Sequence, residues 1–458
     1  ADTSITADTD DTIDIRIAGA DDFQFTANTL TCVSGSTLAT NTISETTAAS
    51  GVTIDGLLIK DSTAAFADGA VATPSITNTG DLNTGVYFPA ADTVGVVTGG
   101  VEQFRFGSNP IPGGGKNLVQ NGAMTIAQRG TVTGLGAASA YALDRWQLVS
   151  TGGAARVTIS QDTDTPAGYG FSQKIDCTTV DSSVAASDLL AVGCKVEGQT
   201  TGLQNLLWGT SDAKTVTLSF WAKTDRSGGG NMGVSIQSAG TDYYATSVAI
   251  TSTWTKFTVV IPGSENTVPV NDNSAELSVS FTLVAGSNFI QTAETWMTSS
   301  AWAVSGQTNL MDHADTDVWF TGVQLEAGDI ATDFSHEPIS ETLAQAQRYL
   351  QRVNCGNAEI GLGWCNAVRE AKISFSLAGS MRATPSINHA TASLFSHSDG
   401  DGGTGLIALS GLFLQQGACQ PQIILLSRHS GGGTYTVGET MRLAGNDAAA
   451  WFELTAEL

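Results

Sequence analysis

The sequence predicts an all-β protein with an N-terminal region of β-hairpins, a central jelly-roll β-sandwich, one short helix and a small C-terminal β-sandwich. Two observations support this fold class. Short runs of alternating apolar and polar residues recur along the chain between turn residues, and 51 of the 458 residues are glycine. Only one stretch, 340–352, places apolar residues at helical spacing.

Residues 1–110 contain an internal repeat over 4–25 and 75–106. DTIDIRIAGADDFQF in the first copy aligns without gaps on DTVGVVTGGVEQFRF in the second, and the tripeptide SIT precedes both. The alternating residues around a glycine turn predict a hairpin with one apolar face. A lone hairpin is marginally stable, so neighbouring units or other copies of the chain must cover that face. We therefore expect a slender, intertwined fibre shaft; two small independent hairpin domains are the alternative.

A linker at 111–116, with three consecutive glycines, precedes a sandwich predicted over 117–335. Within it Val216, Leu218 and Phe220 alternate with polar neighbours, as in a strand that packs one face on a core. Repeated strand signals without a helix predict a two-sheet jelly roll. The expected strands are 156–160, 171–177, 189–196, 215–222, 233–238, 254–261, 276–283 and 318–325.

The helix is expected within a connecting segment, 336–355. Ser340 is the predicted N-cap, and Leu343, Ala346 and Leu350 form its apolar stripe. A stripe of fewer than four turns is not stable alone. We therefore expect three copies of the helix to bury it around a common axis.

A small β-sandwich is predicted over 356–458, with strands at 372–377, 386–395, 406–414, 423–426 and 449–454. Its segment 388–405 ends in a run of Gly and Asp that no core needs, and loops on a rigid sandwich are where binding usually resides. We expect ligand contacts there, although a spacer between two strands is the alternative. The candidate residues are His389, Phe395, His397 and Asp399.

Composition limits the partners. Asp and Glu outnumber Lys and Arg by 44 to 20, for a net charge of -24, which repels phosphate backbones and argues against nucleic acid. No stretch approaches the ~20 apolar residues of a membrane helix, so we expect no membrane insertion. Nothing at the start resembles a signal peptide. The six cysteines lack metal-like spacing and are expected to be buried free thiols.

The sequence shows no GxSxG elbow, no HExxH and no P-loop, and its five histidines are scattered. The acidic run 312–317 is predicted to be a solvated turn, with a calcium loop as the alternative. We expect no metal, no cofactor and no catalytic residue. A hidden carboxylate pair for glycoside cleavage remains open, because sequence alone cannot place two acids in one groove.

Aromatic residues are the stronger functional signal. Sugar rings stack on flat aromatic faces while neighbouring polar groups satisfy their hydroxyls. Trp221 lies on the polar side of its predicted strand, Tyr243 and Tyr244 follow a glycine turn, and Trp302 lies in a long segment without strand pattern. These four are the candidate glycan contacts, although each could instead serve a core or a subunit interface.

Four sets of motifs resemble the tail-fibre and receptor-binding proteins of tailed bacteriophages. They are VWFTGVQLEAG with AQAQRYLQR, NLVQNGAMTIAQRG with YALDRWQ, MRATPSI, and WFELTAEL, and together they span about 116–458. TVTLSFWAKTD also resembles a strand of carbohydrate-binding modules. In these fibres a carbohydrate-binding-like jelly roll leads into a distal tip domain, so 356–458 would be the tip.

The resemblance implies a non-enzymatic, homotrimeric virion tail fibre that attaches the phage to a host glycan or other receptor. It further implies contact with other tail or baseplate proteins through the N-terminal region, and assembly in the host cytoplasm. The alternatives are a glycan-degrading hydrolase on the same scaffold, or a structural virion appendage such as a head fibre.

Overall fold

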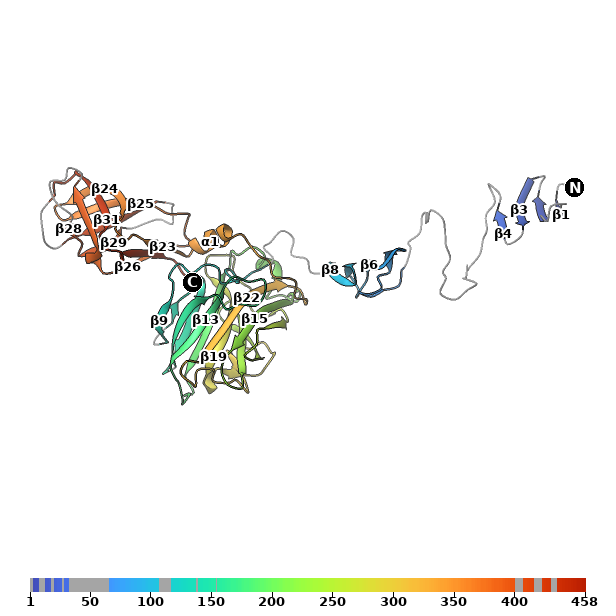
Figure 1. Ribbon diagram of the computed structural model, residues 1–458, viewed down its shortest axis with the longest axis horizontal. Coiled ribbons are helices and arrows are strands. Elements are labelled where there is room, and N and C mark those ends of the chain that lie inside the picture. Colours follow the sequence, from blue (N-terminus) through green and yellow to red (C-terminus); the bar gives the residue numbers. More distant parts are fainter. Residues whose placement is uncertain are drawn as a thin grey trace.

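The structure, a computed structural model, describes residues 3–7, 13–17, 20–26, 29–32, 66–106, 117–136, 139–153, 155–399, 407–415, 422–429 and 435–458. Strands dominate these residues, and α1 (Ile339–Gln347) is the one α-helix among them (Figure 1). The predicted all-β class is confirmed. The linker 111–116 lies outside the described residues.

The N-terminal region forms two four-stranded antiparallel sheets. Their strands are β1 (Ser4–Ala7), β2 (Ile13–Ile17), β3 (Ala20–Thr26) and β4 (Thr29–Cys32), then β5 (Ile76–Asn78), β6 (Asp81–Tyr87), β7 (Val94–Thr98) and β8 (Val101–Phe106). The repeated hairpin is confirmed in detail. Ile13 pairs with Phe25 as Val94 pairs with Phe106, and both hairpins shift register at the same repeat position.

The SIT tripeptides are not equivalent, which corrects that part of the repeat. β1 pairs directly with β2, whereas β5 pairs with β6, and β6 pairs with the repeated strand β7. β6 therefore occupies the position in the second sheet that β1 has in the first. A three-residue match carries too little pairing information to determine strand order.

The central region is a sandwich of two six-stranded antiparallel sheets. Sheet I has the order β10 (Ala140–Tyr141), β11 (Trp146–Thr151), β14 (Leu189–Glu197), β19 (Ala275–Ala285), β16 (Gly230–Ser238), β17 (Asp242–Ile250). Sheet II has the order β18 (Thr255–Ile261), β15 (Val216–Thr224), β22 (Asp317–Ala327), β13 (Ser172–Thr179), β12 (Arg156–Asp162), β9 (Val132–Leu135). The chain crosses repeatedly between the sheets, as a jelly roll requires.

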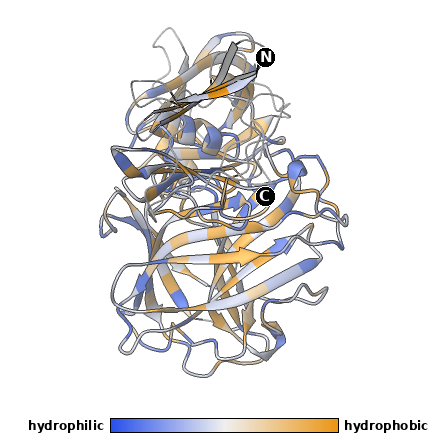
Figure 2. Cartoon of the chain, turned by 90° about the vertical axis from the view of Figure 1, so that its right-hand side faces the viewer, coloured by the Kyte–Doolittle hydropathy of each residue, from blue (hydrophilic) through white to orange (hydrophobic). Residues whose placement is uncertain are grey.

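All eight predicted strands of this region are present, and their inward residues form one core between the sheets. Figure 2 shows the hydrophobic residues concentrated along these strands. At its centre Phe281 lies 4.6 Å from Phe220 and 4.8 Å from Phe320 between ring centroids, and Trp146 contacts Phe320 at 5.2 Å. The prediction missed β9, β10, β11 and β17, whose Thr, Ser, Gly and Ala content weakens the alternation.

The C-terminal region has its own core and two antiparallel sheets. The smaller has the order β23 (Leu350–Asn354), β32 (Trp451–Thr455), β26 (Ser386–His389). The larger has the order β28 (Ile407–Ala408), β27 (Phe395–Asp399), β31 (Thr440–Gly445), β24 (Glu359–Ala367), β25 (Glu370–Ser376), β30 (Gln422–Arg428), β29 (Gly411–Gln415). Cys177, Cys194, Cys355 and Cys365 are buried free thiols, as expected, whereas Cys32 is a free thiol that is only half-buried. Cys419 lies outside the described residues.

The helix prediction is wrong at both ends. Pro338, not Ser340, is the N-cap residue, and α1 ends at Gln347. Leu350 instead begins β23, where it pairs with Thr455. Ala346 and Leu350 are buried within the chain, so of the predicted stripe only the half-buried Leu343 could contact other copies. Strand pairing with distant residues overrides the local helical spacing here.

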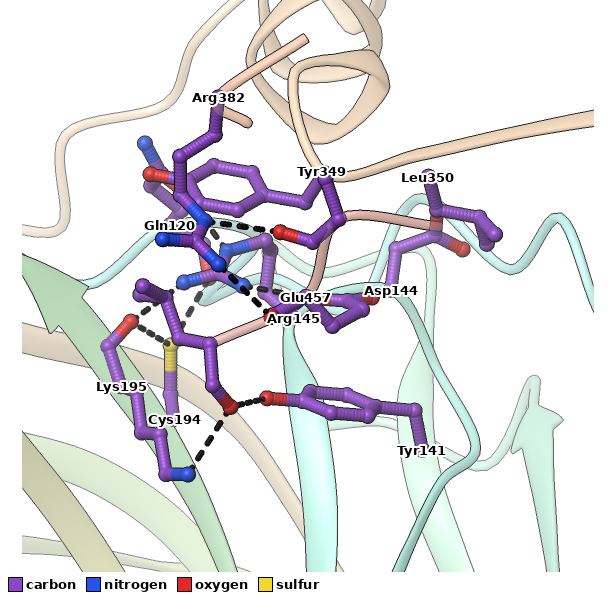
Figure 3. Close-up of polar contacts among 12 residues, drawn as sticks. Gln120, Tyr141, Asp144, Arg145, Cys194, Lys195, Tyr349, Leu350, Arg382 and Glu457 are labelled. Atoms are coloured by element: carbon purple, nitrogen blue, oxygen red, sulfur yellow. Dashed lines mark hydrogen bonds and ion pairs between the residues drawn. The ribbon is translucent and has the colours of Figure 1, made fainter. Parts of the chain in front are cut away.

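A buried arginine connects the sandwich to the C-terminal region (Figure 3). Arg145 is 1% exposed, and its guanidinium forms an ion pair with Glu457 at 2.7 Å. It also donates to Gln120 at 2.9 Å and to the carbonyl of Lys195, and it lies 3.5 Å from the centroid of the Tyr349 ring. Each side of the guanidinium therefore has a partner, as a buried charge requires.

We call this contact region the junction, and all four sets of resembling motifs contribute to it. Arg348 and the Tyr349 hydroxyl bind the Glu197 carboxylate at 2.6 Å each. Arg382 donates to the carbonyls of Ala456 and Glu457, at 2.8 and 3.0 Å. Further hydrogen bonds join Gln128 to Leu350, and Tyr141 and Lys195 to Leu458. The junction is thus a dense polar interface in which the partly buried cations have acceptors.

Replacing Arg145 by Met should destabilise the protein by about 3–5 kcal/mol, because the buried Glu457 would lose its 2.7 Å ion pair and keep only Arg129, at 3.3 Å. Urea unfolding of the purified chain measures the change. Arg442→Met is the control, because Arg442 and its partner Glu359 are 41% and 62% exposed. That pair should contribute at most about 1 kcal/mol. Equal effects of the two substitutions would contradict the assigned role of Arg145.

Candidate functional site

Sheet II presents a row of alternating lysine and tryptophan side chains on its outer face, away from the core. Lys174 on β13 pairs with Trp319 on β22, and Trp319 pairs with Lys223 on β15. Trp254 immediately precedes β18, next to Lys223. The neighbours Val318 and Phe320 point into the core, so the strand alternation places Trp319 on the outer face.

The lysines lie against the tryptophan rings. The Lys223 ammonium is 4.5 Å from the Trp319 ring centroid and 5.4 Å from that of Trp254, and Lys174 is 5.4 Å from Trp319. These are cation–π distances. The row is therefore ordered by contacts between side chains, and it combines apolar ring surface with hydrogen-bond donors.

Carboxylates accept hydrogen bonds from the indole nitrogens of the same rings. Asp164 accepts a hydrogen bond from Trp254 Nε1 at 2.9 Å and forms an ion pair with Lys223, and Asp162 accepts from Trp319 Nε1 at 3.2 Å. The hydrogen bonds from Lys223 and Trp254 hold the pKa of Asp164 below its usual range. Asp164 therefore stays ionised and remains a hydrogen-bond acceptor near neutral pH.

One carboxyl beside the row behaves differently. Asp317 forms an ion pair with Lys174 at 2.7 Å. Burial, helped by the nearby Asp225 and Asp176, nevertheless raises the pKa of Asp317 to about 6. Near pH 6 this group therefore exists in both protonation states, and it can donate or accept a hydrogen bond.

Trp221 extends the row toward Tyr169. It lies two residues before Lys223 on the same face of β15, and its indole is close to the Tyr169 hydroxyl. Burial raises the pKa of Tyr169, so the phenol stays protonated. Tyr169, Trp221 and Trp254 are half-buried, and Trp319 is covered by the lysines. We call Tyr169, Trp221, Trp254 and Trp319 the aromatic platform.

A glycine in β22 makes room for Tyr169. Gly322 has φ +63°, and a Cβ there would lie 2.6 Å from the Tyr169 hydroxyl oxygen. The same place is a register shift between β15 and β22. Both the backbone and the ring contact therefore require glycine here.

The predicted glycan contacts fall on different surfaces. Trp221 is on the platform, whereas Tyr243 and Trp302 lie on the other side of the sandwich. Tyr243 is on β17 of sheet I, where it packs against Ala301 and Val304. Trp302 lies in the segment over that sheet and donates to Ser300 at 2.8 Å. Both are half-buried.

The prediction that Tyr244 is a surface contact is wrong. Only 4% of it is exposed, and its ring packs in the core at 5.6 Å from that of Trp296. Tyr243 and Tyr244 are neighbours on one strand and therefore point to opposite faces. Sequence reasoning treated them as a pair and could not decide which one points outward.

The prediction that Phe395 is a receptor contact is also wrong, because its side chain is fully buried in the C-terminal core. His389 is half-buried, and its ring lies 6.2 Å from that of Phe395. His397 and Asp399 belong to β27, but their side chains, like residues 400–406, lie outside those that the structure describes. The site proposed for the tip is therefore untested beyond Phe395 and His389.

Sequence reasoning missed three of the four platform residues. The alternation of β22 could have placed Trp319 outward, because Val318 and Phe320 are its apolar neighbours. Trp254 was assigned only to a strand. Tyr169 lies in a loop, and nothing in the local pattern brings a loop residue over Gly322.

The acidic run 312–317 does not form a metal site. Arg226 binds both carboxylate oxygens of Asp312, at 3.0 and 2.7 Å, and holds the pKa of that group at about 2. Across the described parts of the chain, no three His, Cys, Asp or Glu side chains are grouped so that they could hold a metal ion. The same residues include no helix long and apolar enough to span a membrane.

No family model and no curated protein matches the chain. Among solved structures it is similar to the enzymatically active domain of tailspike protein 4 from bacteriophage CBA120, at 13% identity and a TM-score of 0.27, over 46% of this chain and 22% of that one. A CBM4 structure matches at 16% identity and a TM-score of 0.24, over 46% of this chain and 99% of that one. The xylan-binding CBM22-1 domain of Xyn10C from Paenibacillus barcinonensis matches at 10% identity and a TM-score of 0.24, over 48% and 98%.

Gly322→Ala should destabilise the sandwich by about 1–3 kcal/mol, through the positive φ and the clash with Tyr169. It should also change tryptophan fluorescence, because the displaced Tyr169 would alter the surroundings of Trp221. Gly328→Ala is the control, since Gly328 also has a positive φ, +109°, but a Cβ there meets nothing within 4 Å. Urea unfolding followed by fluorescence measures both variants. An unchanged native spectrum for Gly322→Ala would contradict the role given to this glycine.

Proposed function

We propose that this chain is a non-catalytic tail fibre of a tailed-bacteriophage virion. It attaches the particle to its host by binding a cell-surface glycan on the aromatic platform of the sandwich. The N-terminal region contacts other tail or baseplate proteins, and the fibre is assembled in the host cytoplasm.

The aromatic platform is the observation that carries the proposal. Three tryptophans and one tyrosine gather on one sheet face, although they come from four separate stretches of the chain. The half-buried rings of Tyr169, Trp221 and Trp254 suit the C–H faces of sugars, whereas Trp319, 8% exposed, supports them from below the lysines. The adjacent Asp162, Asp164, Lys174 and Lys223 supply acceptors and donors for hydroxyl groups. A neutral, hydroxyl-rich chain fits this mixture better than an apolar ligand does.

Two further features support a fibre. The motifs that resemble tail fibres converge on the junction between the sandwich and the C-terminal region. The N-terminal sheets also leave large apolar side chains exposed, with Phe104 at 66% and Phe106 at 62%. Other copies of the chain in a homotrimer would cover these side chains.

Trp254→Ala and Trp221→Ala should each weaken binding of purified host surface polysaccharide about three- to tenfold, since one stacked aromatic contributes about 0.5–1.5 kcal/mol. Calorimetry measures the affinity, and the intact protein should block phage adsorption. Trp364→Ala is the matched control, because Trp364 is 42% exposed on β24 of the C-terminal region.

Three outcomes would contradict this proposal. Loss of binding in Trp364→Ala alone would place the receptor site on the C-terminal region. Polysaccharide that elutes in shorter pieces would indicate a hydrolase. Adsorption that continues unchanged in excess purified protein would indicate an appendage with no role in attachment.

The intact chain should have the mass of a trimer by light scattering at micromolar concentration. The double substitution Phe104→Ser and Phe106→Ser should lower the trimer fraction, because it removes apolar area that the assembly buries. Val260→Ser, at an exposed position of the sandwich, is the control and should leave the mass unchanged. A monomer mass for the unmodified chain would overturn the trimer.

A further inference from the structure

A cavity of about 500 Å³ lies where the sandwich meets α1. Its walls come from residues 117–125, from the turn 197–201 after β14, from the segment 334–337 and from one face of α1. This volume is within the range of about 300–1,000 Å³ that is typical of sites for small ligands. We call it the junction cavity.

Charged and amide groups give the cavity a fixed polar wall. Arg348 binds both oxygens of Glu197, at 3.0 and 2.6 Å, and the Tyr349 hydroxyl adds a third hydrogen bond. Burial opposes ionisation of Glu197, but these hydrogen bonds outweigh it and lower its pKa. Gln345 donates to Glu337 at 3.1 Å on the same side. Glu197 is only 2% exposed and holds this wall in place, whereas the exposed Glu337 and the half-buried Gln345 can bind hydroxyl groups.

Aromatic rings also line the cavity. Phe334 and His336 line the cavity, and their ring centroids are 4.9 Å apart. Phe334 is half-buried and His336 is exposed. The junction cavity thus repeats the chemistry of the platform, with ring faces beside carboxylates, but in a concave shape.

The cavity and the platform are continuous through Tyr169. Its ring lies 5.4 Å from Phe334 and 5.3 Å from His336, and its hydroxyl is close to the indole of Trp221. Ring contacts therefore run from Tyr169 to Phe334 and His336 at the cavity wall, and Trp221 lies next to Tyr169 at the other end. Neighbouring sugars along one glycan chain can each stack on one of these rings.

We infer that the junction cavity binds the end of an extended glycan chain whose preceding sugars lie on the aromatic platform. This inference rests on the proposed glycan binding and adds a requirement for ligand length. A short fragment would occupy the platform alone. A longer one would also enter the cavity and contact Phe334, His336 and the Glu337 side.

The test is a length series, from two to ten sugar units, prepared by partial hydrolysis of purified host surface polysaccharide. Unmodified protein should bind the long fragments about tenfold more tightly than the short ones, as expected for added ring contacts. The double variant Phe334→Ala and His336→Ala should bind short fragments like unmodified protein, without the gain for long ones. Calorimetry at one pH measures all affinities.

A second variant tests the cavity without changing Phe334 or His336. Thr201 is exposed at the cavity wall, so Thr201→Trp should fill the space while Phe334 and His336 stay in place. It should also abolish the gain for long fragments. Trp364→Ala, which lies outside both regions, should retain it.

The outcomes separate the two proposals. Binding with the same affinity at every length, or a full gain in both cavity variants, overturns the junction cavity as a site and leaves the platform intact. An absence of binding to any fragment and to the intact polysaccharide overturns both. Loss of short-fragment binding in the cavity variants would also overturn the inference, because it would place the primary site in the cavity.

Discussion

The fold depends on Arg145, a charged residue that is buried and whose guanidinium nitrogens each have an acceptor. A guanidinium without water is costly unless every side of it is matched. Here the matching groups come from the sandwich, from the start of the C-terminal region and from Glu457, which lies 312 residues further along the chain. Residues after β32 must therefore return to the sandwich, and this couples the two cores through one charge. The position of α1, and hence the wall of the junction cavity, follows from the same constraint.

The aromatic platform uses similar groups with a different result. Lys223 lies over tryptophan rings as Arg145 lies over Tyr349, and carboxylates complete both arrangements. The two arrangements differ in how deeply they are buried, and this difference gives them different roles. Arg145 is out of reach of solvent and holds the fold together, whereas Asp164 is about half exposed and can exchange partners with a ligand. Exposed ion pairs contribute little to stability, so their rearrangement on binding has a small cost.

Much of the fold could be predicted, but little of the site. Alternation identified β15 and β22 and placed Trp221 outward, because side-chain direction in a strand is a local property. It could not decide between Tyr243 and Tyr244, whose strand β17 was missed, nor show that Phe395 enters a core. It also extended the helix through Leu350, since helical spacing alone does not reveal that Leu350 pairs with Thr455.

The sequence by itself determined the all-β class and the repeated hairpin around its glycine turn. These follow from periodicity and backbone freedom, which act over a few residues. Only the tertiary structure decided that Trp254, Trp319, Trp221 and Tyr169 share one surface, and that four separate motifs meet around Arg145. Those arrangements depend on strand order and loop placement, which are set by packing between residues far apart in the chain.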